Sequence, residues 1–414
     1  MSDCLPQKVL TEILSRLPVP SLLRFRCVCK SWLSLISTPD FISKHSSLST
    51  TKTTTPFLLL LRRYSHRRER FSLHLDTQQT FPKLRDLKYP SPTRLKYYFR
   101  ILGSCNGLVC LTDDSFGNTN TNAINLWNPS IQKSLTLPLP KSTRDSDGSF
   151  FMCALGFGFD SMSNDYKVVR VSYSGGEDGF WVPPKVEIYA VREKSWRDFE
   201  GFVPEFGITE YFWSQVCVNG NVHWVGYKRV NPVTRGCFVV VFDLGGEVFG
   251  EMELPGSLVH EFPSNMMVSV MDECLSVLVY DKRAFSKQCT VWVMKEYGVA
   301  ESWSKQYEID LDGRLVLVLG LRKNGEMLLV MGKELVSYNP ESEGIKKLGV
   351  SGCKDSFWFG DYTESLVLLG GADSVNGEAE PSVSEEADGL EDDAVGLRAY
   401  YMQTIMLNAP EACL

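Results

Sequence analysis

The stretch "INLWNPSIQKSLTLPLP" at residues 124–140 decides the fold class, because it is typical of a strand, a polar turn and a second strand finished by proline. The pattern recurs in "FSLHLDTQQTFPKL" (71–84), "VEIYAVREKSWRDF" (186–199), "VVVFDLGGEVFGEMELP" (239–255), "VWVMKEYGVAESWSKQYEI" (291–309) and "LVSYNPESEGIKKL" (335–348). Its turns begin at Asp76, Asn128, Ala190, Asp243, Met294 and Asn339. A spacing of about 50 residues indicates a repeat architecture.

A second element, a tight hairpin leading into an apolar strand, often lies upstream of the first. It occurs as "SCNGLVCL" (104–111), "VNGNVHWV" (218–225), "MDECLSVLV" (271–279) and "KNGEMLLV" (323–330). Asn-Gly supplies the positive φ angles that two-residue hairpins require. Two hairpins per repeat predict a four-stranded blade, so we expect a β-propeller. Six repeats favour six blades; a seventh closed by the chain ends and an irregular β-sandwich are alternatives.

The chain starts with helices whose apolar surface is large. The stretch "LPVPSLLRFRCVCKSWLSLI" (17–36) is predicted to be helical, with Ser21 as N-cap and Pro39 closing it. The preceding "LPQKVLTEILSRL" (5–17) is also predicted to be helical and amphipathic. Helices totalling about 40 residues cannot bury so much apolar surface alone, so we expect a partner for this face.

Charge is distributed unevenly along the chain. The net charge is −7, and residues 371–414 hold ten Asp or Glu and one Arg, which leaves +2 on the rest. This acidic tail is predicted to be disordered, and the nearly neutral body predicts no general attraction to nucleic acid or anionic membrane. Twelve cysteines are scattered through a sequence without a secretory start or an apolar run of membrane-span length. We therefore expect reduced thiols and a cytoplasmic or nuclear location.

No catalytic, cofactor or metal site is predicted. The five histidines lack metal-chelating helical spacing, and no Cys-x-x-Cys occurs. "GFGFDS" (156–161) lacks the third glycine of a dinucleotide loop and leads into a strand. The Arg-rich residues 62–70 are interpreted as a charged loop, with a nuclear signal or a nucleic-acid-binding patch as the alternative. Five tryptophans at blade positions are expected to pack between blades: Trp127, Trp196, Trp224, Trp292 and Trp303.

Two parts of the sequence resemble a known family. Residues 5–45, "LPQKVLTEILSRLPVPSLLRFRCVCKSWLSLISTPDFISKH", closely resemble an F-box. Residues about 100–345 resemble the F-box-associated (type 1), kelch-like repeat region of plant F-box proteins. The matching blocks are "GSCNGLVCL", "LWNPS", "GFGFDSMSNDYKVVRV", "VNGNVHWV", "VVVFDL" and "VWVMKEYGVAESWSK". The last four are similar to those of F-box proteins that restrain plant immune signalling.

The resemblance, together with the Ser/Thr-rich and the acidic compositions, divides the chain into four segments. These are a small all-α F-box of three short helices (1–46), a Ser/Thr-rich linker (47–56), a propeller-like all-β domain (57–370) and the acidic tail (371–414). The F-box is expected to bind a Skp-type adaptor, and cullin through it, by helix-in-groove contact. The expected contact residues are Leu5, Pro6, Leu10, Ile13, Leu14, Leu17, Pro18, Leu22, Leu23, Arg24, Phe25, Val28 and Trp32. Some of these must instead hold the helices together.

The implied function is substrate recognition in a Skp–cullin–F-box ubiquitin ligase, without catalysis by this chain. The target protein, with an immune receptor as one candidate class, and the residues that bind it are not identified by the resemblance. The alternatives are a non-degradative F-box scaffold and an F-box protein of the pollen-recognition (S-locus) type. A propeller enzyme or lectin is disfavoured, because the catalytic and metal motifs are missing.

Deleting residues 373–414 is expected to leave the thermal unfolding midpoint of the propeller nearly unchanged, because a disordered acidic segment buries little surface. Differential scanning calorimetry of the full and truncated chains measures this. Destabilisation by far more than about 1 kcal/mol would mean that "LRAYYMQTIML" (397–407) supplies a strand.

Overall fold

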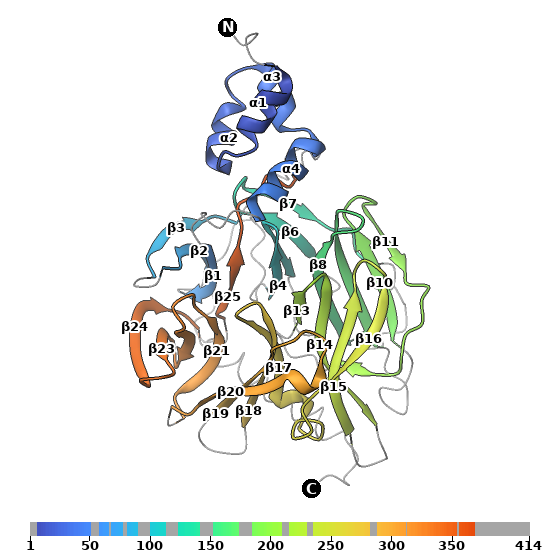
Figure 1. Ribbon diagram of the computed structural model, residues 1–414, viewed down its shortest axis with the longest axis vertical. Helices are drawn as coiled ribbons and strands as arrows, with labels where there is room; N and C mark the ends of the chain where they lie inside the picture. Colours follow the sequence, from blue (N-terminus) through green and yellow to red (C-terminus); the bar gives the residue numbers. More distant parts are fainter. Residues whose placement is uncertain are drawn as a thin grey trace, which may run out of the picture.

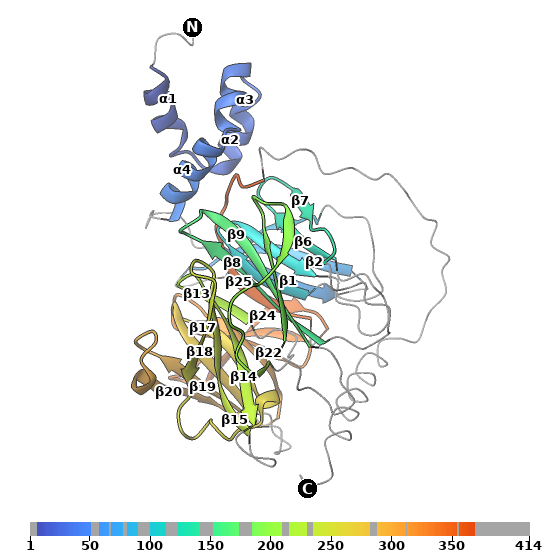
Figure 2. The same ribbon diagram turned by 90° about the vertical axis from the view of Figure 1, so that its right-hand side faces the viewer.

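The structure, a computed structural model, joins a helical module to a ring of β-sheets (Figures 1 and 2). It describes residues 6–368 except 51–57, 66–67, 78–80, 90–99, 113–122, 141–151, 174–183, 209–214, 230–234, 282–287, 312 and 354–355. The acidic tail, including residues 397–407, therefore lies outside the described residues.

The helical module contains four short helices: α1 (Gln7–Leu14), α2 (Val19–Phe25), α3 (Lys30–Ile36) and α4 (Pro39–Thr50). The prediction of one helical stretch over 17–36 was wrong in its detail, because Cys29 is extended (φ −159°, ψ 163°) and separates α2 from α3. Ser21 is not the N-cap; α2 begins at Val19 with proline in its first turn, where the missing N–H costs no hydrogen bond.

Pro39 follows the end of α3 and also starts a fourth helix, in addition to the three predicted. Proline suits the first turn of a helix for the same reason as in α2. The helix α4 continues to Thr50, into the stretch predicted as a linker, and residues 51–57 lie outside the described part.

The ring consists of six antiparallel sheets, numbered here as blades 1–6 and given from the inner strand outward. Blade 1 is β25 (Trp358–Tyr362), β1 (Leu58–Ser65), β2 (Arg68–Leu75) and β3 (Lys83–Leu87). Blade 2 is β4 (Arg100–Cys105), β5 (Leu108–Thr112), β6 (Ile124–Asn128) and β7 (Lys133–Thr136). Blade 3 is β8 (Met152–Asp160), β9 (Asp165–Tyr173), β10 (Lys185–Ala190) and β11 (Ser195–Asp198).

The other three blades complete the circle. Blade 4 is β12 (Gly207–Ile208) and β13 (Gln215–Val218), both paired with β14 (Asn221–Arg229), then β15 (Arg235–Asp243) and β16 (Val248–Glu253). Blade 5 is β17 (Met266–Met271), β18 (Cys274–Asp281), β19 (Gln288–Met294) and β20 (Trp303–Ile309). Blade 6 is β21 (Leu315–Leu321), β22 (Met327–Met331), β23 (Glu334–Asn339) and β24 (Gly344–Ser351).

The fold is a six-bladed β-propeller, which excludes the seven-bladed and sandwich alternatives. The inner strands of successive blades contact one another around a closed ring. The two ends of the β domain do pair, but they do so within blade 1 and add no further blade: β25 runs antiparallel to β1, with Leu58 opposite Tyr362 and Arg62 opposite Trp358. The six predicted turn positions each end, or directly follow, the third strand of a blade.

The predicted tight turns differ in chemistry. Asn106–Gly107 and Asn219–Gly220 have positive φ, as predicted for two-residue hairpins. The turn Asp272–Glu273 has the same sign of φ without glycine. Asn324 lies in a longer connection, residues 322–326, between β21 and β22.

Tryptophans join neighbouring blades, as predicted. The indole N–H of Trp196 in blade 3 donates to Pro138 O beside blade 2, over 2.6 Å. Trp224 in blade 4 donates to Leu155 O in blade 3 (3.0 Å), and Trp303 in blade 5 donates to Glu253 O in blade 4 (2.9 Å). Each bond satisfies a buried indole N–H while its ring packs between the sheets.

The Arg-rich stretch is a hairpin of β1 and β2, so its interpretation as a loop was wrong. Arg62 is fully buried. Its Nε donates to Glu69 on β2 (2.8 Å), and its Nη1 donates to Ser356 O near β25 (2.7 Å). The sequence pattern missed this role because the partner carbonyl is far away in the chain.

Deleting residues 358–414 is expected to lower the unfolding midpoint of the propeller sharply. The deletion removes the hydrogen-bonding partner of β1 and the buried Tyr362 side chain, a loss of several kcal/mol on the order of a core truncation. Calorimetry beside the 373–414 deletion measures the effect, and equal midpoints for the two truncations would contradict closure by β25.

Candidate functional site

The helical module has its own small core. Its fully buried apolar side chains are Leu14, Val19, Leu22, Ile36 and Phe41. A propeller residue, Leu366, is buried in the same cluster. Short helices reach this degree of burial by packing on one another and on the propeller, because each alone has too little surface.

A second set of apolar side chains faces outward. Val9, Ile13, Val28 and Leu33 are 42%, 47%, 61% and 41% exposed. They lie on α1, on the α2–α3 connection and on α3. The helices α1 and α3 lie farther from the propeller than α4 does (Figures 1 and 2). Apolar side chains that the described part of the chain leaves uncovered on neighbouring helices indicate a protein-binding surface.

The residues predicted to contact the adaptor divide into groups by burial. Leu14 and Leu22 are buried in the module core, and Leu5 lies outside the described residues. The half-buried members pack against the core, and these are Leu10, Leu17, Leu23, Phe25 and Trp32. The exposed members are Pro6, Ile13, Pro18, Arg24 and Val28. Phe25 and Trp32 meet edge to face, with ring centroids 5.3 Å apart, and so tie α2 to α3.

Val9 and Leu33 are exposed residues that the predicted contact set left out. Val9 lies on the predicted apolar stripe of the first helix. Leu33 was harder to find, because a continuous helix over 17–36 assigns the wrong face to every position beyond Cys29. The break at Cys29 is therefore the local feature that the sequence analysis lacked.

Polar contacts join α4 to α1 and to the α1–α2 connection. Lys44 on α4 pairs with Glu12 on α1 and lowers the pKa of that carboxyl group. The ring of His45 hydrogen-bonds Leu17 O (3.0 Å) and stacks on Phe41. These contacts hold the helices together and do not involve the exposed apolar side chains.

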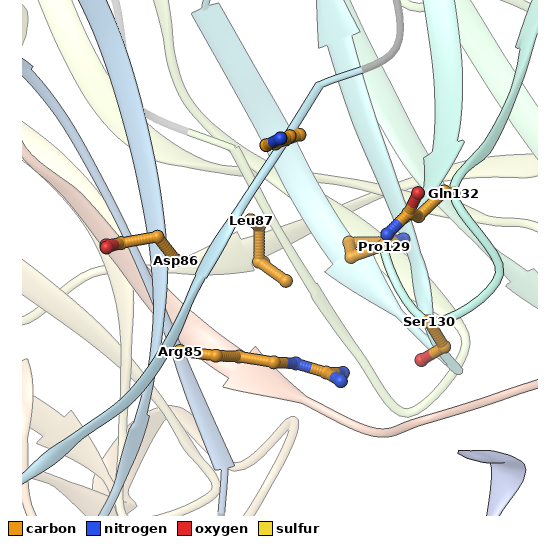
Figure 3. Close-up of a pocket in the computed structure, with 7 residues that line it drawn as sticks. Arg85, Asp86, Leu87, Pro129, Ser130 and Gln132 are labelled. Atoms are coloured by element: carbon orange, nitrogen blue, oxygen red, sulfur yellow. The ribbon is translucent and has the colours of Figure 1, made fainter.

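A small cavity of about 240 Å³ lies between β3 and the β6–β7 turn (Figure 3). It is lined by Arg85, Asp86, Leu87, Lys88, Pro129, Ser130 and Gln132. The guanidinium of Arg85 extends toward Ser130, whereas the carboxylate of Asp86 points away. Arg85 Nη2 already binds Glu364 Oε1 at 2.9 Å, which disfavours a second anion there.

Other chemistry has little support in the described part of the chain. No group of three or more His, Cys, Asp or Glu there is placed to hold a metal ion. The ten cysteines within it are free thiols, and burial raises the pKa of Cys105 and Cys110 on the "CNGLVC" hairpin, which makes them poor nucleophiles. None of its helices is long and apolar enough to cross a membrane.

Comparison with known proteins matches both parts of the chain. The model of the F-box domain matches residues 2–44, and that of the F-box associated beta propeller domain matches residues 59–355. An F-box/kelch-repeat protein of Arabidopsis thaliana is 29% identical, covering 85% of this chain and 93% of the relative. Another Arabidopsis F-box protein is 30% identical (86% and 89% covered), and F-box protein CPR1 of the same plant is 29% identical (88% and 89%).

Replacing Leu14 or the adjacent Ile13 by aspartate is expected to change the stability of the module by very different amounts. Leu14→Asp buries an unpaired carboxylate among apolar side chains, at a cost of several kcal/mol, on the order expected for a buried charge. Ile13→Asp places the same charge in water and should change stability by about 0.5 kcal/mol or less. Amide hydrogen exchange of residues 7–48 measures both, and equal protection in the two variants would contradict the burial assignment.

Proposed function

Because the chain belongs to the plant F-box proteins that carry an F-box associated β-propeller domain, we propose that it is the substrate-recognition subunit of a Skp–cullin–F-box ubiquitin ligase. In this proposal the F-box docks on a Skp-type adaptor and thereby on cullin. The propeller binds the target protein. The complex works in the cytoplasm, the nucleus or both.

The observation that carries the proposal is the apolar surface of the F-box. Ile13 and Val28 are exposed although each is large and apolar, and they occur where helices lie away from the propeller. An apolar helical face of this kind binds in a complementary groove of another protein. We propose that these two residues, with Val9 and Leu33, enter the adaptor, while Leu14 and Leu22 act indirectly by holding the helices together.

The contribution of the chain to ubiquitin transfer is proximity in this proposal. A rigid scaffold that holds a target lysine near a loaded conjugating enzyme converts a bimolecular encounter into an effectively unimolecular one. Propeller loops are suited to target binding, because the blades hold them in place. An immune receptor is the first target class to test, since four sequence blocks resemble F-box proteins that restrain plant immunity.

The double variant Ile13→Asp, Val28→Asp is expected to lose adaptor binding, because each carboxylate would enter an apolar groove at a cost on the order of several kcal/mol. Co-purification from plant cells measures it: the intact chain should recover both adaptor and cullin. The matched control is Val248→Asp, because Val248 on the propeller is 58% exposed and Val28 is 61% exposed. This control should leave recovery unchanged.

Two outcomes would count against the proposal. Unchanged adaptor recovery by the double variant would contradict the assigned surface. Recovery of the adaptor without cullin by the intact chain would favour a non-degradative scaffold.

A further inference from the structure

The residues that follow the closing strand form a bridge between the propeller and the F-box. Residues 363–368, here called the exit segment, leave the end of β25 in blade 1. In both ribbon views the chain beyond β25 rises toward the helices (Figures 1 and 2). The covalent connection between the F-box and β1 is a different stretch of the chain, residues 51–57, which lie outside the described residues. The F-box and the propeller are therefore joined by the covalent chain and also by the packing of the exit segment on the helices.

Leu366 is the member of the exit segment that belongs to the F-box core. It is 1% exposed and lies in the cluster formed by Leu14, Leu22 and their neighbours. Ile131, on the β6–β7 turn, packs against the same cluster. The F-box core is therefore completed by two residues of the propeller.

The residues on both sides of Leu366 in the exit segment contact the propeller instead. Val367 and Leu368 pack against the core shared by blades 2 and 3. Ser365 and Thr363 lie so close to Gly107 that a Cβ there would approach Ser365 Oγ to 2.3 Å and Thr363 O to 2.6 Å. Two adjacent side chains thus anchor the exit segment to different domains: Leu366 packs in the F-box core, and Val367 packs against the core of blades 2 and 3.

The buried side-chain amide of Asn128 holds in place the two propeller segments that reach the F-box core, which are the exit segment and the β6–β7 turn. Asn128 Nδ2 donates to Ser365 O (3.0 Å) and Val367 O (2.9 Å). Its Oδ1 accepts a hydrogen bond from Ser130 N (2.9 Å), in the turn that carries Ile131. Because Asn128 is fully buried, breaking these bonds would leave unsatisfied polar groups.

Two further contacts lie on either side of this amide. Arg85 on β3 pairs with Glu364 at the start of the exit segment, beside the cavity of Figure 3. On the other side, Asn164 Nδ2 in the β8–β9 turn donates to Ser43 Oγ on α4, over 3.3 Å. Blades 1, 2 and 3 therefore all take part in seating the helices.

We propose that the exit segment sets the orientation of the F-box relative to the propeller, with Leu366 as the positioning residue. This inference rests on the proposed function, in which the F-box carries the adaptor and the propeller carries the target. Transfer of ubiquitin depends on how the two are placed, because small misplacements of reacting groups slow a reaction by large factors. Leu366 acts without touching either partner.

The test compares Leu366→Ala with Val367→Ala in the full-length chain. Fluorescent non-natural amino acids replace Ser34 on α3 and Lys347 on β24, both exposed, and single-molecule energy transfer reports their separation. The labelled chain without further substitution should show a single narrow distribution of energy-transfer efficiencies. Leu366→Ala should broaden this distribution and leave the unfolding midpoint of the propeller unchanged. Val367→Ala should lower that midpoint and keep the distribution narrow. Leu366→Met, which retains apolar bulk, should restore the narrow distribution.

A second readout separates this inference from the proposed function. In a reconstituted ligase, Leu366→Ala should keep the affinity for the adaptor and slow ubiquitin transfer to the target by about tenfold or more. A narrow distribution in Leu366→Ala would overturn the positioning role, whatever the ligase assay gives. A broadened distribution with no transfer by the parent ligase would support positioning and count against the proposed function. Hydrogen exchange of the helices shows whether Leu366→Ala still folds its F-box. If the helices lose protection, Ile131→Ala is measured instead, because Ile131 packs on the same F-box cluster from the β6–β7 turn.

Discussion

The pairing of β25 with β1 is the constraint on which the rest of the structure depends. A propeller is stable only when its ring is complete, and here the inner strand of blade 1 is contributed by the far end of the domain. Leu60 on β1 is fully buried in the apolar cluster between blades 1 and 2, to which β25 contributes Tyr362. The buried Arg62 joins the two ends of the β domain directly, because it donates to Glu69 on β2 and to Ser356 O just before β25.

A second buried cation joins blade 1 to the neighbouring blade 6. Arg322, after β21, pairs with Asp76 at the end of β2, over 3.1 Å between Nε and Oδ1. Its remaining donors reach Glu326 and Ser337, and its guanidinium lies 5.4 Å from the centre of the Phe81 ring. A buried ion pair requires this degree of satisfaction, because desolvation otherwise exceeds the Coulombic gain. Strand pairing thus completes blade 1, and a buried ion pair ties that blade to blade 6.

Closure of the ring and seating of the F-box share one piece of chain. The exit segment begins where β25 ends, so the register of Tyr362 opposite Leu58 fixes how far Leu366 reaches into the helices. Tyr362 also contacts the β6–β7 turn through a hydrogen bond with Ser130 Oγ, over 2.7 Å. The packing of the F-box on the propeller is in this way tied to the completeness of the propeller ring.

The sequence by itself determined the repeat and the family and favoured six blades, because these depend on short-range signals. Only the pairing of β25 with β1 inside one of six sheets excluded a seventh blade. Asn-Gly turns, third-strand ends such as Asn128 and Asp243, and an F-box pattern are all readable within a few residues. The order of helices before strands and the apolar face of the first helix can also be identified from short stretches of sequence. Such features follow from local backbone preference and from the spacing of apolar residues.

Only the tertiary structure decided which apolar residues of the F-box are core and which are surface. Leu14 and Ile13 are adjacent and equally apolar in sequence, and packing against α2, α4 and Leu366 buries only Leu14. The Arg62 contact with Ser356 and the capture of the exit segment by Asn128 were equally invisible, because each joins residues more than 200 positions apart. The physical reason is that pattern and propensity act along the chain, whereas ring closure brings together segments whose sequences carry no mark of one another.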